Sequence, residues 1–241
     1  MKRPLRIRYF KIELTLTHAR QALRSAAQPA TAKTHHSYFK GAAKESFLGV
    51  PTPIIRQLAK QFATASFVEI GTLMQSSLFD ERVLANLILV TKYEKGSEEA
   101  QHTIATFYIK NIQHIHDWAN VDNSAPYILG RHLLHRDRAL LYELISSKRI
   151  WDRRIALVTT WWFIRQDDVE ETLQLTIKVL KDSEDLIHKA AGWMLREVGK
   201  RNNKALERFL NKYAALMPRT MLRYAIEKFP QPKRARYLQM R

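Results

Sequence analysis

A segment of similar pattern returns along this chain at a nearly constant spacing, and this periodicity constrains the fold more than any other feature. The repeated segments centre on one apolar residue each: Ala85, Val121, Ala156, Ala191 and Ala225. Neighbouring centres lie 34 to 36 residues apart, which is room for two helices and a turn. We therefore expect HEAT-like helical repeats stacked into a curved superhelix, with one helix of each repeat on a concave face.

Composition and local signals agree with helices. The chain has only 7 glycines among 241 residues, and strand-like alternation of apolar and polar residues is scarce. Thr52 is expected to be an N-cap with Pro53 at the first helical position, and Asp80 is expected to cap FDERVLANLILV. The sequence predicts an all-α protein, with a basic arm over residues 1–12 and one domain over residues 13–241.

Several classes of protein are disfavoured. The chain has no cysteine, which excludes disulfides, thiolate zinc sites and cysteine nucleophiles. The basic start MKRPLRIRYFKIELTLTH lacks the apolar core of a signal peptide, and no run reaches the roughly 18 apolar residues of a membrane span. We expect a soluble cytoplasmic protein, associated with the nucleoid and monomeric, with no membrane partner.

The net charge of +17 is distributed unevenly. Residues 131–165 hold 8 Lys and Arg against 3 Asp and Glu, residues 189–241 hold 14 against 3, and residues 166–188 are acidic. A role in general solubility would spread the charge more evenly. The regional pattern favours helices that face a polyanion, and the expected concave face is therefore basic.

Register across the repeats brings candidate functional residues together. If equivalent positions of neighbouring repeats lie side by side, one surface gathers two tryptophans, one carboxylate and several cations: Trp118, Asp122, Arg153, Arg154, Lys189, Trp193 and Arg196. Each residue also has a simpler interpretation, because tryptophans at helical spacing usually pack in a core and an aspartate can cap a helix. We expect Trp161 and Trp162 to belong to the core.

The segments FLGVPTPIIRQLAKQ, HDWANVDNSAPYILG, RIWDRRIALVTTWW and IHKAAGWMLREVGKRN resemble the AlkD-type DNA alkylation-repair glycosylases in the order in which that family carries them. The resemblance runs from about residue 14 to the C-terminus. It implies a HEAT-like superhelix that cradles duplex DNA and excises N3- and N7-alkylated purines, of the 3-methyladenine and 7-methylguanine type, without flipping the base.

The same resemblance assigns roles to residues of this chain. The catalytic aspartate of the family corresponds to Asp122, its site tryptophans to Trp118 and Trp193, and its site arginines to Arg154 and Arg196. The further candidates for DNA contact are Thr52, Arg56, Arg153, Lys189, Lys200 and Arg201. One departure is visible, since members commonly carry a second tryptophan where this chain has Asp117.

The chemistry of an alkylated purine suits these residue types. The base is already cationic and leaves readily, so the barrier is the positive charge that develops on the deoxyribose. A carboxylate near that sugar stabilises the charge and can orient water, and indole faces attract the same cation. Arginine forks would hold the flanking phosphates.

Two other functions remain open from the sequence. The chain could be a non-catalytic HEAT-repeat protein that binds DNA, or a HEAT-type scaffold whose concave face binds an acidic protein. No cofactor is expected. No metal site is expected either, because HIH at 114–116 and His132 with His135 lack an HExxH pattern or a second carboxylate ligand.

Overall fold

The computed structural model describes residues 15–38 and 46–240. Within these residues all regular structure is helical, apart from one isolated bridge between Ser46 and Leu78, so the all-α prediction is confirmed. The basic arm predicted over residues 1–12 lies outside the described residues.

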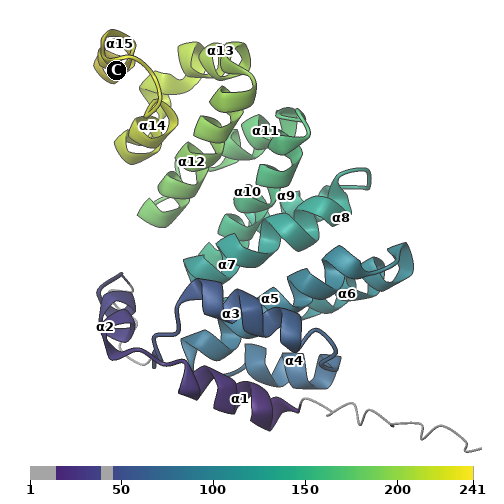
Figure 1. Cartoon of the computed structure of the whole chain (residues 1–241). Coiled ribbons are helices and arrows are strands. Elements are labelled where there is room, and N and C mark those ends of the chain that lie inside the picture. The colour runs from purple at the N-terminus through teal and green to yellow at the C-terminus, as the bar shows by residue number, and fades with distance from the viewer. Residues whose placement is uncertain (1–14, 39–45, 241) are drawn as a thin grey trace, which may run out of the picture.

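Five helices follow one another through the middle of the molecule, and we call them the central row: α5 (Phe79–Lys95), α7 (Trp118–Ala125), α10 (Ile150–Arg165), α12 (Asp185–Arg201) and α14 (Arg219–Ala225). Each helix packs on the next one along the row (Figure 1). All five repeat centres predicted from the sequence lie on these helices and are at most 2% exposed. The sequence period is therefore the step from one row helix to the next.

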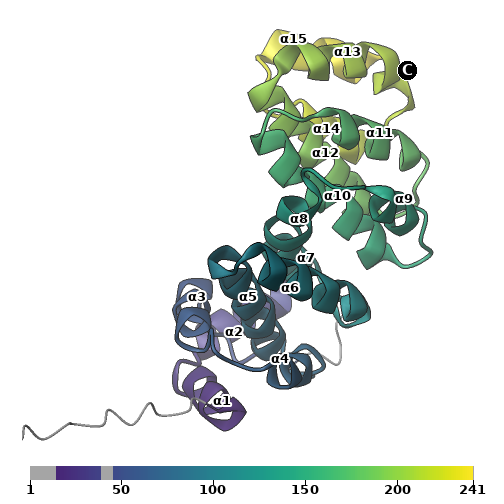
Figure 2. The same cartoon turned by 90° about the vertical axis from the view of Figure 1, so that its right-hand side faces the viewer.

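The remaining helices extend and flank this row. The N-terminal end consists of α1 (Leu16–Ser25), α2 (Pro29–Tyr38), α3 (Thr52–Gln61) and α4 (Phe67–Met74). Between and beyond the row helices lie α6 (Glu98–Lys110), α9 (Ala139–Ile145), α11 (Glu170–Lys178), α13 (Asn203–Tyr213) and α15 (Gln231–Gln239). Figure 2 shows α1 to α6 at one end of the molecule and α9 to α15 at the other, with α7 and the short α8 (Arg131–Leu133) between them.

The second row helix is irregular. After α7 the chain continues through a π-helical stretch, η2 (Pro126–Gly130), into the short α8 (Arg131–Leu133). Pro126 has no backbone N–H, so the carbonyl of Asp122 lacks the usual donor four residues later. Single π-helical turns inside helices occur frequently at functional sites. The α7 helix is thus the place in the row where the backbone departs from the regular α-helix.

Two expected helix caps were wrong. Helix α3 begins at Thr52 with Pro51 in the N-cap position, one residue earlier than expected. Helix α5 begins after Leu78, so Asp80 does not cap it. The fully buried Asp80 carboxylate instead accepts the backbone N–H groups of Leu48 and Val50, at 2.7 and 2.8 Å. Backbone N–H groups about 30 residues earlier in the chain thus satisfy this carboxylate, which a local sequence signal does not reveal.

The expectation that Trp161 and Trp162 belong to the core is confirmed only in part. Both indoles are half-buried on α10, and only Trp161 packs against the apolar core. An arginine guanidinium lies over each ring: Arg165 over Trp161 and Arg131 over Trp162. Neighbouring cations therefore cover part of these two rings.

Helices α12 and α14 approach most closely at Gly192. A Cβ atom added there would lie 2.5 Å from the carbonyl oxygen of Met221 and 2.5 Å from Cβ of Tyr224. We predict that Gly192→Ala lowers the free energy of unfolding by about 1 to 3 kcal/mol, because backbone must move to admit the methyl group. The measurement is urea denaturation followed by circular dichroism.

Gly71→Ala on α4 is the matched control. Its added Cβ would have Cζ of Phe107 at 3.7 Å as its nearest neighbour, an ordinary van der Waals contact. Alanine is the better helix former, so this variant is expected to gain about 0.5 to 1 kcal/mol. Equal stability of the two variants would contradict the close approach of α12 and α14.

Candidate functional site

Helix α7 presents Trp118 and Asp122 one turn apart on the same face. The helix starts at Trp118 because the Asp117 carboxylate, in the N-cap position, accepts the backbone N–H of Asn120 at 2.8 Å. Trp118 is half-buried, and the Asp122 side chain retains 19% of its exposure. Neither side chain is closed off from solvent.

Arg154 on α10 grips the Asp122 carboxylate with two parallel hydrogen bonds. Its Nε donates to Oδ1 at 3.1 Å and its Nη2 donates to Oδ2 at 2.8 Å. Its Nη1 donates to the carbonyl of Leu186 on α12 at 2.9 Å, and the side chain is only 7% exposed. One guanidinium therefore joins α7, α10 and α12 and fixes the orientation of the carboxylate.

Burial raises the pKa of Asp122 above its ordinary value, and the positive charge and hydrogen bonds of Arg154 oppose that rise. The neighbouring carboxylate of Asp117 raises the pKa further. The ionised form of Asp122 thus depends on its arginine partner, because a largely desolvated carboxylate alone would hold its proton more tightly.

Helix α12 carries the second candidate tryptophan, Trp193. Trp193 lies two turns after Leu186, is half-buried, and has cations at the positions four before and three after it. The first, Lys189, pairs with Asp185 at 2.7 Å, and this contact raises the lysine pKa. The second, Arg196, pairs with Glu227. The indole is flanked by cations whose partners are acidic residues.

Arg153, the residue before Arg154, has different partners. Arg153 pairs with Asp182 at 2.7 Å and donates to the carbonyls of Ser147 and Lys148, both at 2.9 Å. Arg153 is 13% exposed and links α10 to the loops that precede α10 and α12, whereas the adjacent Arg154 reaches Asp122.

Lys200 and Arg201 lie at the other end of α12. Lys200 pairs with Glu197 at 2.6 Å, and Arg201 grips Asp167 with two hydrogen bonds of 2.8 and 2.7 Å. Both cations are nearly half exposed. They are therefore accessible, but they lie three turns or more along the helix from Lys189 and Leu186.

On the opposite side of α7, α3 contributes Thr52 and Arg56, which are both exposed. Arg56 donates to Oδ1 of Asn123 at 2.8 Å, directly beside Asp122 in the chain. The structure thus brings Arg56 and Arg154 to α7 from two sides.

A contact repeated along the row identifies the residues equivalent to Trp118. Arg82 and Arg153 each donate to the backbone carbonyl six residues earlier, at 2.9 Å, and a ring nitrogen of His188 makes the same contact at 2.6 Å. In the repeat register Trp118 is the equivalent residue on α7. There the carbonyl, that of Ile112, accepts Nη2 of Arg149 from the next repeat at 3.1 Å.

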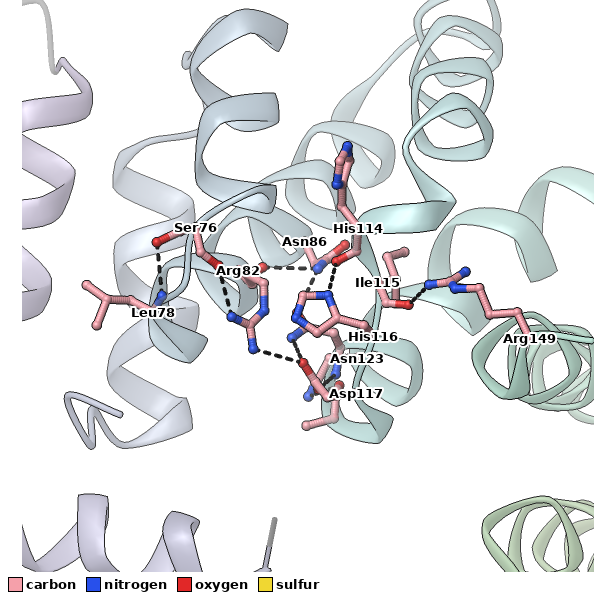
Figure 3. A network of polar contacts seen from close by, with 12 residues as sticks. Ser76, Leu78, Arg82, Asn86, His114, Ile115, His116, Asp117, Asn123 and Arg149 are labelled. Atoms are coloured by element: carbon pink, nitrogen blue, oxygen red, sulfur yellow. Dashed lines mark hydrogen bonds and ion pairs between the residues drawn. The ribbon is translucent and has the colours of Figure 1, made fainter. Parts of the chain in front are cut away.

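Arg149 therefore supplies for α7 the contact with this loop carbonyl that Arg82 supplies for α5 and Arg153 for α10. It reaches back from the start of α10 to three carbonyls of the loop before Trp118: those of Ile112, Gln113 and Ile115. Figure 3 draws the contact with Ile115. The sequence analysis missed Arg149, and aligning the repeats at Arg82, Trp118 and Arg153 is the signal that could have found it.

Asp117 belongs to a buried polar network between α5 and α7 (Figure 3). Its carboxylate pairs with Nη2 of Arg82 at 3.5 Å and accepts Nδ2 of Asn120 at 2.5 Å, while Asn86 donates to Asn120 at 2.7 Å. All four residues are buried. Where the resemblance leads one to expect a second tryptophan, this chain thus has an N-cap that is also an ion-pair partner.

Two features are absent from the described ranges, 15–38 and 46–240. No three His, Asp or Glu side chains among those residues gather closely enough to hold a metal ion. No helix in those ranges is both long and apolar enough to cross a membrane.

The fold and this site define an all-helical protein whose stacked row presents a guanidinium-held carboxylate and two half-buried indoles. Residues 19–229 match the family model described as DNA alkylation repair enzyme, and this chain belongs to that family. Among solved structures, a predicted DNA alkylation repair enzyme from Enterococcus faecalis has a TM-score of 0.67 at 19% identity, over 85% of this chain and 97% of that one. This likeness concerns the fold. No match was found among curated proteins.

We predict that Asp117→Ala lowers the free energy of unfolding by about 3 to 5 kcal/mol. The substitution removes the N-cap of α7 and leaves the Arg82 guanidinium buried without its carboxylate. Chemical denaturation gives the value. Ser97→Ala is the control, because it removes only the exposed cap of α6, for a cost of about 1 kcal/mol. If the two variants lost equal stability, the network would contribute nothing beyond the cap.

Proposed function

We propose that this protein is a monofunctional DNA glycosylase that hydrolyses the N-glycosidic bond of cationic N3- and N7-alkylated purines in duplex DNA. The observation that carries the proposal is the Asp122 carboxylate, held by Arg154 and still open to solvent, one turn from the half-buried Trp118. Membership of the DNA alkylation repair family supports DNA as the substrate.

In this proposal Asp122 stabilises the positive charge that develops on the deoxyribose as the glycosidic bond stretches. The departing base needs no proton, since alkylation has already made it cationic. The carboxylate must be ionised for this role, and Arg154 favours that form. Arg154 uses three of its five N–H donors on Asp122 and Leu186, so two remain for a nearby phosphate.

Trp118 and Trp193 would line the same site from α7 and α12. An indole face attracts a cationic nucleotide by about 0.5 to 2 kcal/mol, depending on desolvation, without reading the identity of the base. Arg196, Lys189 and Arg56 would contact phosphates around the lesion. The row would curve around the duplex as a HEAT-like superhelix with a basic concave face, and excision without base flipping would need no pocket for an extruded base.

The direct test is to incubate the protein with duplex that carries 7-methylguanine and to quantify abasic sites above the spontaneous rate. Release of base supports the glycosylase. Binding of the duplex without release would favour a non-catalytic DNA-binding protein, and absence of salt-sensitive duplex binding would favour a scaffold for protein partners.

We predict that Asp122→Asn lowers the single-turnover rate of excision by about 100-fold or more while the affinity for duplex is maintained. Asparagine keeps the shape and can still accept one hydrogen bond from Arg154, so only the charge is lost. The exposed Asp137→Asn is the matched control and should excise like the wild type. An unchanged rate for Asp122→Asn would remove this carboxylate from the mechanism.

The pH profile gives an independent prediction. Excision requires ionised Asp122, so the rate falls as the pH drops through the pKa of this residue. Arg154 opposes the rise in that pKa, and Arg154→Gln should therefore move the acidic limb of the profile to higher pH. Asp117→Asn should move it to lower pH, because Asp117 raises the pKa of Asp122.

The measurement is the midpoint of the acidic limb, after subtraction of the spontaneous release at each pH. Midpoints make the comparison independent of the height of each profile. If both variants moved the limb in the same direction, Asp122 would not be the group that titrates.

A further inference from the structure

A second cluster of aromatic and cationic side chains lies further along the central row, and the proposed site does not use it. We call it the aromatic ledge, and it consists of Tyr127, Arg131, Trp161, Trp162 and Arg165. The Tyr127 ring lies 5.7 and 6.4 Å from the rings of Trp161 and Trp162. The guanidinium of Arg131 lies 4.2 Å from the Trp162 centroid, and that of Arg165 lies 4.9 Å from the Trp161 centroid.

The two arginines of the ledge differ in what their N–H groups contact. Arg131 pairs with Glu94 at 3.3 Å. Arg165 is exposed and has no hydrogen bond or ion pair with the residues that the structure describes. When an arginine stacks on an indole, the ring covers the face of the guanidinium and leaves the N–H groups along its edge free to bind a phosphate. Arg165 is therefore held in place by Trp161 with its donors available.

The ledge lies on the same helix face as the proposed site. Trp161 follows Arg154 by seven residues, which is two turns, or about 10 Å along α10. Arg165 follows Arg154 by 11 residues, or about 16 Å along the same helix. Two lines of side chains cross the row: one from Asp122 through Arg154 to Leu186, and one from the ledge to Lys200, which lines a hollow together with Trp161 and Arg165.

Hollows lie on both sides of the ledge and are lined by further cations. One, of about 320 Å³, lies beside Trp161 and is lined by Arg165, Lys200 and Arg201 together with Glu197. The other, of about 260 Å³, lies beside Tyr127 and is lined by Arg56 and Lys60 together with Glu94. Cations outnumber acids around both hollows, and this favours an anionic ligand over a cationic or neutral one.

We propose that the aromatic ledge binds the backbone of the DNA strand opposite the lesion, with Arg165 as its phosphate contact and the indoles against the sugars. This inference rests on the proposed function in taking duplex DNA as the ligand. The argument for the opposite strand is spacing. Arg154 and Arg165 lie about 16 Å apart along α10, which exceeds the width of either groove, roughly 6 and 12 Å, so the two arginines can reach the backbones on the two sides of one groove.

The first test measures the affinity for undamaged duplex over a series of salt concentrations by fluorescence anisotropy. Arg165→Gln is expected to weaken binding several-fold at low salt and to reduce the slope of log K against log salt by about 1, as loss of one phosphate contact does. Arg208→Gln is the matched control, because Arg208 is exposed on α13, outside the row, and should change neither quantity. If Arg165→Gln behaved like Arg208→Gln, the proposal would be overturned.

The second test assigns the strand. Duplexes with a slowly hydrolysed 2′-fluoro-7-methylguanosine would carry uncharged methylphosphonate linkages, in the lesion strand or in the opposite strand. Neutralising the opposite strand should weaken the wild type but add little to the loss in Arg165→Gln, while neutralising the lesion strand should weaken both proteins equally. The reverse pattern would overturn the assignment.

Both tests measure binding, so they separate this inference from the proposed function. A protein that excises base but whose Arg165→Gln variant binds normally would contradict the ledge alone. A protein that shows the predicted coupling without releasing base would contradict the glycosylase and leave the ledge supported.

Discussion

The Arg154 guanidinium makes the contacts on which the proposed site depends, because it joins three consecutive helices of the row. It starts from α10, holds the Asp122 carboxylate on α7 and donates to the backbone of α12. A buried ion pair of this kind often adds little net stability, since desolvation of the charges offsets their attraction. Its main effect here is geometric, because it sets where one carboxylate lies relative to Trp118 and Trp193.

Helix α7 can carry Trp118 and Asp122 because its neighbours provide contacts that the other row helices make for themselves. Arg149 donates to the carbonyl of Ile112, which a cation at position 118 would otherwise contact. Arg82 on α5, together with Asn120 on α7 itself, holds the Asp117 carboxylate that caps α7. Pro126 then interrupts the regular hydrogen bonding one turn after Asp122. The irregularity of α7 is thus supported on both sides by regular repeats.

The sequence predicted the features that depend on periodicity, and it left open those that depend on the direction in which each side chain leaves its helix. The all-α class and the positions of the row helices followed from the spacing of Ala85 and its equivalents. Arg153 and Arg154 looked alike in sequence, yet adjacent residues point about 100° apart on a helix, so one reaches Asp182 and the other Asp122. Asp80 was assigned to the wrong cap because its partners lie about 30 residues earlier in the chain.

The ion pairs also indicate which cations are free to meet DNA in a chain of net charge +17. Arg82 and Arg153 are almost buried with their carboxylates, and removing a partner from such a pair costs several kcal/mol, so they stay in place. Lys189 and Lys200 hold their acidic partners at an exposed surface, where an ion pair contributes little and a phosphate can replace the carboxylate. The acidic residues along the row therefore keep the cations ordered in the absence of DNA, and Arg165, stacked on an indole, is kept ordered without one.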